Sequence, residues 1–277
     1  MRPFTYHTHS TFCDGRNSLA DMAKAAFEAG ADSLGLSCHS HVEFDRYGGI
    51  ALERIPEFQA EIHRLRELYA PKGLEIFTGI EQDAYSKKVS KSEGYDYIIG
   101  SMHYLLVNGE YVTIDAKHNF AENLDKYFSG DALSMTLQYF DNMCSLYERT
   151  DCDIVGHFDV ITKFNEGGCL FDERDPKYET AAQLAIEKLV KKGLIFEINT
   201  GCMARGYRSV PFPSARFLCM IRELGGKVTY SSDSHNTDSI LASFEQAKKL
   251  ALKCGFDHFM KLKRTPDDCV FTPVEID

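Results

Sequence analysis

The 277-residue sequence contains no tryptophan, no long apolar run and no excess of basic residues. Its apolar stretches, such as Leu34-Gly35-Leu36, are far shorter than the roughly 20 residues that a helix needs to cross a bilayer, so no membrane span is expected. The 41 Asp and Glu residues outnumber the 31 Lys and Arg residues, which gives a formal net charge of −10. Because non-specific nucleic-acid binding requires a basic surface, this balance argues against a nucleic-acid partner.

The nine cysteines are odd in number and include no CxxC pair. Residues 1–7 hold no apolar segment of the kind found in secretion signals. We therefore expect reduced, mostly buried thiols and a cytoplasmic protein. The apolar fraction of 44% and the charged fraction of 26% are ordinary for a globular protein, and no linker or repeat divides the chain. The sequence predicts a single domain over residues 1–277.

Short apolar or β-branched segments alternate with longer helical patterns along the chain. Seven segments are predicted as strands: 4–9, 33–39, 74–83, 95–104, 152–159, 194–201 and 227–235. The predicted helices lie between them, over residues 19–29, 52–69, about 121–149, 177–192, 214–224 and 239–254. Repeated strand–helix–strand units indicate a parallel sheet, and seven strands in one domain favour an α/β fold closed into a TIM-like barrel. No GxGxxG or Walker A motif follows a predicted strand, which weakens the alternative of an open nucleotide-binding sheet.

Each predicted strand carries a polar residue able to bind metal at or just beyond its C-terminal end, where parallel barrels hold their active sites. In chain order these residues are His7, His9, Asp14 in the following loop, His39, Glu81, His103, His157, Glu197, Asp233 and His235. Residues two apart on a strand face the same side, so His7 and His9 share one space. Zinc takes about four ligands, and the larger set therefore predicts two or three ions.

Each of these residues has an ordinary alternative role. A lone HxH pair is weak support for a metal, a buried histidine more often bonds a carbonyl group, and Glu197 could be an ion-pair partner inside the barrel. The metal interpretation is favoured because six of the ten histidines fall at predicted strand ends. His63 and His258 fall in helical patterns and are expected to be solvated. His118 has no predicted role, and His41 is near enough to His39 to line the site.

These segments resemble the polymerase-and-histidinol-phosphatase (PHP) superfamily. The residues that carry the resemblance follow in order as His7-Thr8-His9-Ser10, Cys13-Asp14-Gly15, Gly79-Ile80-Glu81, Gly100-Ser101-Met102-His103, Gly156-His157-Phe158-Asp159 and Ser232-Asp233-Ser234-His235. The resemblance implies a distorted seven-stranded barrel with three divalent ions, and a mixed nitrogen and oxygen ligand set suits zinc, manganese or iron. The implied sites are His7, His9, Glu81 and Asp233; Glu81, His103 and His157; and Asp14, His39 and His235.

Within the superfamily, the chain resembles the histidinol-phosphate phosphatase branch. Residues 156–164, and Glu197-Ile198-Asn199-Thr200 followed by Arg205, carry this narrower resemblance. It implies hydrolysis of L-histidinol phosphate to L-histidinol and phosphate, a step of histidine biosynthesis. Two positions depart from the family pattern: Ser234 replaces the usual alanine, and Gly201-Cys202 follows Thr200 in place of a Ser-Gly pair.

Phosphomonoester hydrolysis needs charge neutralisation and a nucleophile at neutral pH, and clustered metal ions supply both. We therefore predict a metal-bridging hydroxide as nucleophile, with catalytic roles for Glu81, Asp233 and His235. The proton for the leaving alkoxide is open between Asp233, His235, His41 and metal-bound water.

The substrate itself is predicted to be a small phosphate ester. Because guanidinium binds phosphate bidentately, Arg16 and Arg205 are the predicted phosphate ligands, with Lys163 and Arg208 as weaker candidates. Glu43 and Asp159 are the candidate acceptors for the cationic end of histidinol phosphate.

Three other functions remain open on the sequence alone. A PHP-type nucleotidase or exonuclease would share the metal residues but needs a basic groove or stacking aromatics. A metal-dependent amidohydrolase barrel would need a bridging lysine, and no predicted strand offers one at its C-terminal end. A catalytically silent metal-binding module has no need of a complete ligand set. The oligomeric state is open.

Overall fold

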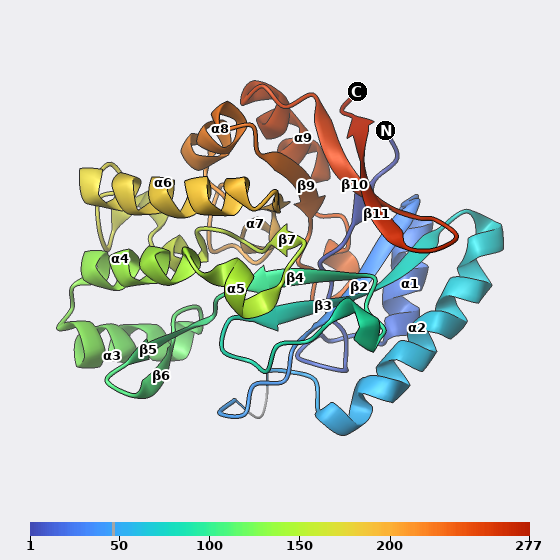
Figure 1. Cartoon of the computed structure of the whole chain (residues 1–277), viewed down its shortest axis with the longest axis horizontal. Helices are drawn as coiled ribbons and strands as arrows, with labels where there is room; N and C mark the ends of the chain where they lie inside the picture. Colours follow the sequence, from blue (N-terminus) through green and yellow to red (C-terminus); the bar gives the residue numbers. More distant parts are fainter. Residues whose placement is uncertain (46–47) are drawn as a thin grey trace.

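The computed structural model describes residues 1–45 and 48–277. Figure 1 shows the strands of the main sheet at the centre, with α1 (Leu19–Glu28) and α2 (Ile55–Tyr69) on one side and α4 (Ala132–Met143) and α6 (Pro176–Lys191) on the other. Seven strands form one sheet: β1 (Phe4–Thr5), β2 (Ser33–His39), β3 (Glu75–Asp83), β4 (Tyr97–Ser101), β7 (Ile154–Val155), β8 (Ile195–Asn199) and β9 (Lys227–Ser231). They are hydrogen-bonded in this order, and all neighbours are parallel.

The sheet closes where its first strand meets its last. Thr8 forms a parallel bridge with Ser234, and the His9 N–H donates to the Ser234 carbonyl at 2.8 Å. The hydroxyls of Thr5 and Ser232 add a contact at 3.2 Å. This closure confirms the predicted seven-stranded barrel. The barrel is distorted because β1 and β7 have only two residues each.

Five long helices follow the predicted order: α1 (Leu19–Glu28), α2 (Ile55–Tyr69), α6 (Pro176–Lys191), α8 (Ala215–Glu223) and α9 (Phe244–Lys253). Helix α1 shows why they form. Ser18 and Asp21 make a reciprocal capping box at its start, and its buried residues Leu19, Met22, Ala23 and Ala26 follow the helical period. The short α7 (Gly201–Ala204) follows β8 directly.

The predicted helix over residues 121–149 is wrong in its bounds and continuity. The structure has α3 (Lys117–Phe128), α4 (Ala132–Met143) and α5 (Leu146–Thr150) in its place. Ser129 and Gly130 both have left-handed backbones, with φ of 53° and 78°, and these end α3. The Asp131 side chain then caps α4 by accepting from the Ser134 N–H.

Two antiparallel hairpins lie outside the predicted strands. In the first, β5 (Tyr104–Val107) and β6 (Glu110–Thr113) are joined by Asn108 and Gly109, both with positive φ, as a two-residue hairpin turn requires. The second pairs β10 (His258–Arg264) with β11 (Cys269–Glu275). The predicted helical setting of His258 is therefore wrong, although its side chain is exposed as expected. His63 lies exposed on α2, as predicted.

The interior of the barrel below the site is filled by large side chains. Phe77, Gly79 and Glu81 point to one face of β3 because they are two residues apart. The Tyr97 ring fills the space beside Gly79 and Gly35, where a Cβ atom at either glycine would collide with it, and its hydroxyl donates to the Tyr6 carbonyl. This packing supports Glu81 from below.

All nine cysteines are free, but only four are buried: Cys38, Cys152, Cys202 and Cys269. The expectation of mostly buried thiols is therefore wrong. Within the described ranges, no helix combines the length and the apolar character needed to cross a bilayer.

Asp96 ties the C-terminal hairpin to the barrel. Its Oδ2 accepts from Arg66 Nη2 at 2.6 Å, from the Thr78 N–H at 2.8 Å and from Arg264 Nη2 at 3.0 Å. Burial opposes the charge of Asp96, but its bonds to Arg264 and Thr78 and the charge of Arg66 outweigh burial and hold its pKa below the ordinary value of 3.8. Because Asp96 directly precedes β4, the hairpin covers the N-terminal end of the barrel.

We expect Asp96→Asn to lower the free energy of unfolding by about 1–3 kcal/mol at pH 7, since hydrogen bonds to a charged group are lost. A depressed folded-state pKa stabilises the fold above the unfolded pKa, and this stabilisation is lost as pH falls through the folded pKa. Urea unfolding at several pH values should therefore show the difference in full at pH 7 and a smaller one below about pH 4. Asp267→Asn, in the exposed turn of the same hairpin, is the control and should change little. An Asp96→Asn difference that is constant with pH would contradict the assignment.

Candidate metal centre

The nine side chains predicted to bind metal lie together at the C-terminal ends of the strands. His39 and Glu81 lie on β2 and β3, and the others lie on the segments that follow β1, β4, β7 and β9. They form four overlapping groups, and the ligand atoms within each group lie within 4.8 Å of one another. The groups are His9, Asp14, His39 and His235; His7, His9 and Asp233; His7, Glu81 and His157; and His39, Glu81 and His103.

The fully buried Glu81 carboxylate lies at the centre of these groups. Its Oε1 lies 2.9 Å from His157 Nε2 and 3.2 Å from His103 Nε2. Its Oε2 lies 2.7 Å from His39 Nδ1 and 3.1 Å from His7 Nε2. The two oxygens thus face two different sets of imidazoles, which is the arrangement that a carboxylate bridging two ions requires.

Asp233 and Asp14 supply two further carboxylates. Asp233 has a left-handed backbone, with φ of 48°, and its Oδ1 lies 3.3 Å from His9 Nε2. Its Oδ2 accepts from Arg205 Nη2 at 2.9 Å. Asp14 Oδ2 lies 3.3 Å from His235 Nε2, and Asp14 Oδ1 lies 3.6 Å from His39 Nε2. These contacts place the three carboxylates on different sides of the histidine cluster.

Charge in the cluster is balanced between imidazoles and carboxylates. Burial opposes ionisation of Glu81, yet the neighbouring His39 and His7 outweigh it and hold the pKa of Glu81 well below its usual range. Burial likewise opposes a charge on His7, but Glu81 and Glu197 raise its pKa well above the usual value. For His235, burial and the charge of His9 together lower the pKa.

Outer partners fix the orientation of three rings. His7 Nδ1 lies 3.0 Å from Glu197 Oε2, His103 Nδ1 lies 3.2 Å from Asp83 Oδ2, and His9 Nδ1 lies 3.5 Å from the Cys13 thiol. Each contact leaves the opposite ring nitrogen directed at the centre, as in metal sites whose histidines are held by an outer group. Glu197 was predicted as a metal-capable residue at a strand end, with an ion pair inside the barrel as the alternative, and the structure shows it paired with His7. Asp83 was not predicted. Asp83 follows Glu81 by two residues, so strand alternation could have identified it.

The residues fit divalent cations. Nε2 of His7, Nε2 of His9 and Oε2 of Glu81 are buried and make no hydrogen bond to any residue in the described ranges. Unpaired buried polar atoms are costly, and a cation would satisfy them together. Imidazole and carboxylate ligands suit zinc, manganese and iron.

A cavity of about 190 Å³ opens from the centre. Arg205 and Lys163 line it, as do six residues of the cluster: Asp14, His39, His103, His157, Asp233 and His235. Arg205 Nη1 donates to the Asp233 carbonyl at 2.9 Å and lies 3.1 Å from His235 Nδ1. The structure thus brings two of the four predicted phosphate-binding cations to the centre.

The other two cations lie outside this cavity, against the prediction. Arg208 is buried, and its guanidinium is paired with Glu173 at 2.8 Å and Glu166 at 3.2 Å. Arg16 is exposed and does not line the cavity, although its N–H donates to the His235 carbonyl at 2.8 Å.

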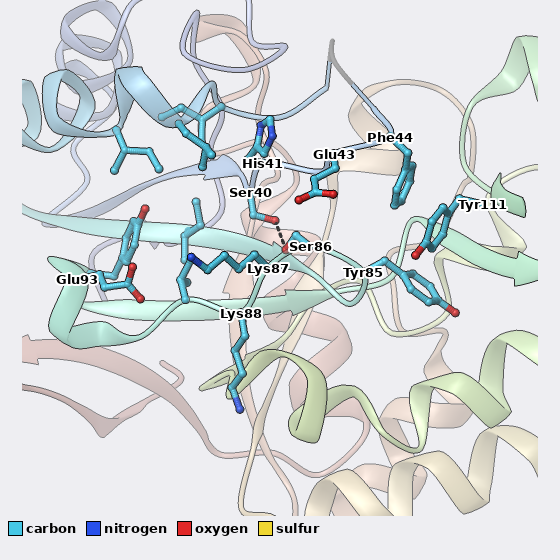
Figure 2. Close-up of a pocket in the computed structure, with 16 residues that line it drawn as sticks. Ser40, His41, Glu43, Phe44, Tyr85, Ser86, Lys87, Lys88, Glu93 and Tyr111 are labelled. Carbon is cyan, nitrogen blue, oxygen red and sulfur yellow. Dashed lines mark hydrogen bonds between the residues drawn. The ribbon is translucent and has the colours of Figure 1, made fainter. Parts of the chain in front are cut away.

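His41 and Glu43 line a different, larger cavity of about 690 Å³ (Figure 2). Ile80 also lines this cavity. Because Ile80 and Glu81 point to opposite faces of β3, the cavity lies on the face of β3 opposite to Glu81. Figure 2 shows Ser40 and Ser86 joined there by a hydrogen bond of 2.9 Å. The predicted place of His41 and Glu43 beside the substrate therefore does not agree with the structure.

Asp159 lines neither cavity. It is buried and accepts from the Ser214 N–H at 3.0 Å. Burial raises its pKa to about 7. The predicted place of Asp159 beside the substrate therefore does not agree with either cavity.

The comparisons with known proteins agree with this geometry. Residues 5–201 match the PHP domain. The chain belongs to the PHP domain family. A Schizosaccharomyces pombe protein named probable histidinol-phosphatase is 25% identical over 96% of this chain and 91% of its own length. A Deinococcus radiodurans protein with the same name is 27% identical over 88% of this chain and 90% of its own length.

Solved structures share the fold. A candidate histidinol phosphatase, HisK, from Listeria monocytogenes superposes with a TM-score of 0.76 at 18% identity, over 88% of this chain and 99% of its own. Histidinol phosphate phosphatase HisK from Lactococcus lactis, in complex with zinc, L-histidinol and phosphate, gives a TM-score of 0.69 at 19% identity, over 94% of this chain and 96% of its own.

Glu81→Gln in this PHP domain should reduce the metal bound per chain by at least one ion, because the amide cannot supply two anionic oxygens. The barrel should persist, since its core is apolar. Elemental analysis of protein purified without chelator, with circular dichroism alongside, checks both points. His63→Ala on the exposed face of α2 is the control and should keep wild-type metal content. Full metal content in Glu81→Gln would rule out the bridging role.

Proposed function

We propose that this chain is a metal-dependent phosphomonoesterase that hydrolyses L-histidinol phosphate to L-histidinol and phosphate. The observation that carries the proposal is the cluster of six imidazoles and three carboxylates, buried around Glu81 and exposed at Asp14, that opens beside Arg205 and Lys163 into one small cavity. The relatives named probable histidinol-phosphatases, which match almost end to end, support the substrate. So do the L-histidinol and phosphate bound in the Lactococcus lactis structure.

The proposed cofactors are three divalent ions, of zinc, manganese or iron. The first would be held by His7, His9, Glu81 and Asp233, the second by Glu81, His103 and His157, and the third by Asp14, His39 and His235. Such ions lower the pKa of bound water and neutralise phosphoryl oxygens. His9 also lies with Asp14, His39 and His235 in one group, and it would be the fourth ligand there.

The chain's own cations complete the phosphate site. Arg205 uses Nη1 and Nη2 to hold Asp233, which keeps that carboxylate directed at the histidines, and its charge lies at the wall of the cavity. Lys163 donates to the Asp115 carbonyl at 2.8 Å and has two further N–H groups. Both side chains can therefore donate to phosphoryl oxygens. Asp233 and His235 lie beside Arg205 and are the proposed groups that would pass one proton of the attacking water to the leaving alkoxide, so that water supplies both the hydroxyl of the phosphate and the proton of the alcohol.

The small cavity favours a metabolite over a polynucleotide. Its volume of about 190 Å³ lies below the roughly 300–1,000 Å³ of pockets that take drug-sized ligands. The acidic net charge of −10 also disfavours a nucleic-acid substrate.

We further propose a single domain over residues 1–277, because β8, the last strand that the family match reaches, pairs with β9, and β9 closes the same sheet. The nine free thiols suit a reducing compartment, and we propose the cytoplasm.

The test is kcat/KM for histidinol phosphate against AMP, p-nitrophenyl phosphate and a short single-stranded oligonucleotide. We expect histidinol phosphate to be preferred by at least about 100-fold, as expected of a site built to bond the polar groups of its substrate. Chelation should abolish turnover, and added zinc or manganese should restore it. A preference for AMP or the oligonucleotide would assign a nucleotidase or exonuclease activity, and turnover that survives complete metal removal would overturn the metal dependence.

A further inference from the structure

The cavity at the metal centre contains one carboxylate outside the metal groups. Three carboxylates line it, those of Asp14, Asp233 and Asp115. Asp14 and Asp233 belong to the metal groups, whereas Asp115 belongs to none of those found in residues 1–45 and 48–277. The β5–β6 hairpin brings Asp115 there, because the Ile114 N–H donates to the His103 carbonyl at 3.0 Å.

The Asp115 carboxylate has acceptor capacity to spare. Its Oδ2 lies 3.4 Å from Lys163 Nζ, and its Oδ1 lies 3.4 Å from the Thr113 hydroxyl, which are both long contacts. The short bond of Lys163, at 2.8 Å, goes to the backbone carbonyl of Asp115 instead. An ionised carboxylate offers about four lone-pair sites, so a short bond to a ligand cation can still form.

The Lys163 ammonium group, 3.4 Å from Asp115 Oδ2, favours the anionic form of this carboxylate. Burial opposes its charge, but Lys163 and the nearby histidines, His103 first among them, outweigh burial and hold its pKa below the usual value. Its side chain keeps 27% of its surface exposed, which makes the anion accessible from the cavity.

The rest of the lining is apolar or aromatic. Val160, Tyr207 and Phe212 line the same cavity, and Lys163 Nζ lies 5.1 Å from the centre of the Tyr207 ring. One small space therefore offers cations beside the metal groups, one available anion and an aromatic wall.

We propose that Asp115 binds the ammonium group of the substrate and is the residue that makes the site specific for an amino-alkyl phosphate; this rests on the proposed function. Histidinol phosphate carries an ammonium group between its phosphate and its imidazole. With the phosphate beside Arg205 and Lys163, the ammonium group pairs with Asp115 and the imidazole contacts the aromatic wall. A substrate without the amine forgoes this hydrogen bond to a charged group, and that loss produces discrimination. Glu43 and Asp159, the acceptors predicted from sequence, lie outside this cavity.

The experiment compares histidinol phosphate with its deamino analogue, the same ester without the amino group. Wild type should prefer histidinol phosphate by about 10- to 100-fold in kcat/KM, the range for a hydrogen bond to a charged group. Asp115→Asn should remove most of this preference by lowering kcat/KM for histidinol phosphate. The value for the deamino analogue should stay within about twofold, because its complex never used the charge. Asp115→Glu should regain part of the preference.

Two measurements separate this role from a structural one. Metal content per chain should be unchanged in Asp115→Asn, which excludes loss of an ion as the cause. Glu43→Gln, in the larger cavity, should keep the wild-type preference. The proposal is overturned if Asp115→Asn keeps the preference, if it impairs both esters equally, or if Glu43→Gln loses the preference instead. A wild type that hydrolyses neither ester would refute the proposed function itself, which is a different result.

Discussion

A carboxylate buried in a protein stays ionised only where positive charge or hydrogen-bond donors surround it, and Glu81 imposes this demand on the whole barrel. Five imidazoles meet it, those of His7, His9, His39, His103 and His157, at 2.7–3.5 Å from its oxygens. They come from four separate parts of the chain. The site therefore exists only when the sheet has closed, and the Thr8–Ser234 bridge that closes it also brings His9 to Asp233. Fold and site form together.

The two ends of the barrel have different roles: the N-terminal end stabilises the fold, and the C-terminal end carries the side chains of the site. At the N-terminal end, Asp96 joins Arg66, Arg264 and the backbone of Thr78, and the C-terminal hairpin covers the strand starts. At the C-terminal end, ionisable side chains replace the apolar core, and imidazoles and carboxylates balance one another's charge. Loops at this end, including the β5–β6 hairpin, can therefore differ between relatives while the closed end keeps the fold.

Much of this architecture could be predicted from the sequence because it depends on local signals. Strand alternation placed His7, His9, Glu81, Asp233 and their neighbours at the strand ends, and the structure brings those residues together. Strand lengths were overestimated: the ladder of β1 ends at Thr5, two residues before His7, and only the isolated bridge of Thr8 follows it. The break between α3 and α4 was predictable in part, because Gly130 commonly ends a helix and Asp131 commonly caps the next one, whereas the left-handed backbone of Ser129 has no signal in a serine.

The substrate-facing residues were harder to predict because the path of a loop is decided by tertiary contacts. Glu43 follows His39 by four residues, yet it lines the cavity behind β3. Asp115 follows β4 by many residues, but the β5–β6 hairpin places it at the site. The Asn108-Gly109 turn of this hairpin was visible in the sequence. The turn could have been recognised from the sequence. The hydrogen bond between Ile114 and His103, which positions Asp115, could not.

The Tyr97 ring occupies the space that side chains at positions 35 and 79 would need, and its hydroxyl is anchored to Tyr6. Positions 79 and 97 can therefore be substituted in only one order. A side chain at position 79 collides with the ring while Tyr97 remains, whereas replacing the tyrosine first opens a void that a larger residue at 79 can fill. At position 35 a Cβ atom would also meet the Tyr6 Cα atom at 2.9 Å, so glycine is required there even without the ring. As related proteins diverge, we therefore expect a substitution at position 97 to come before one at position 79. A lineage that retains Tyr97 is expected to retain both glycines.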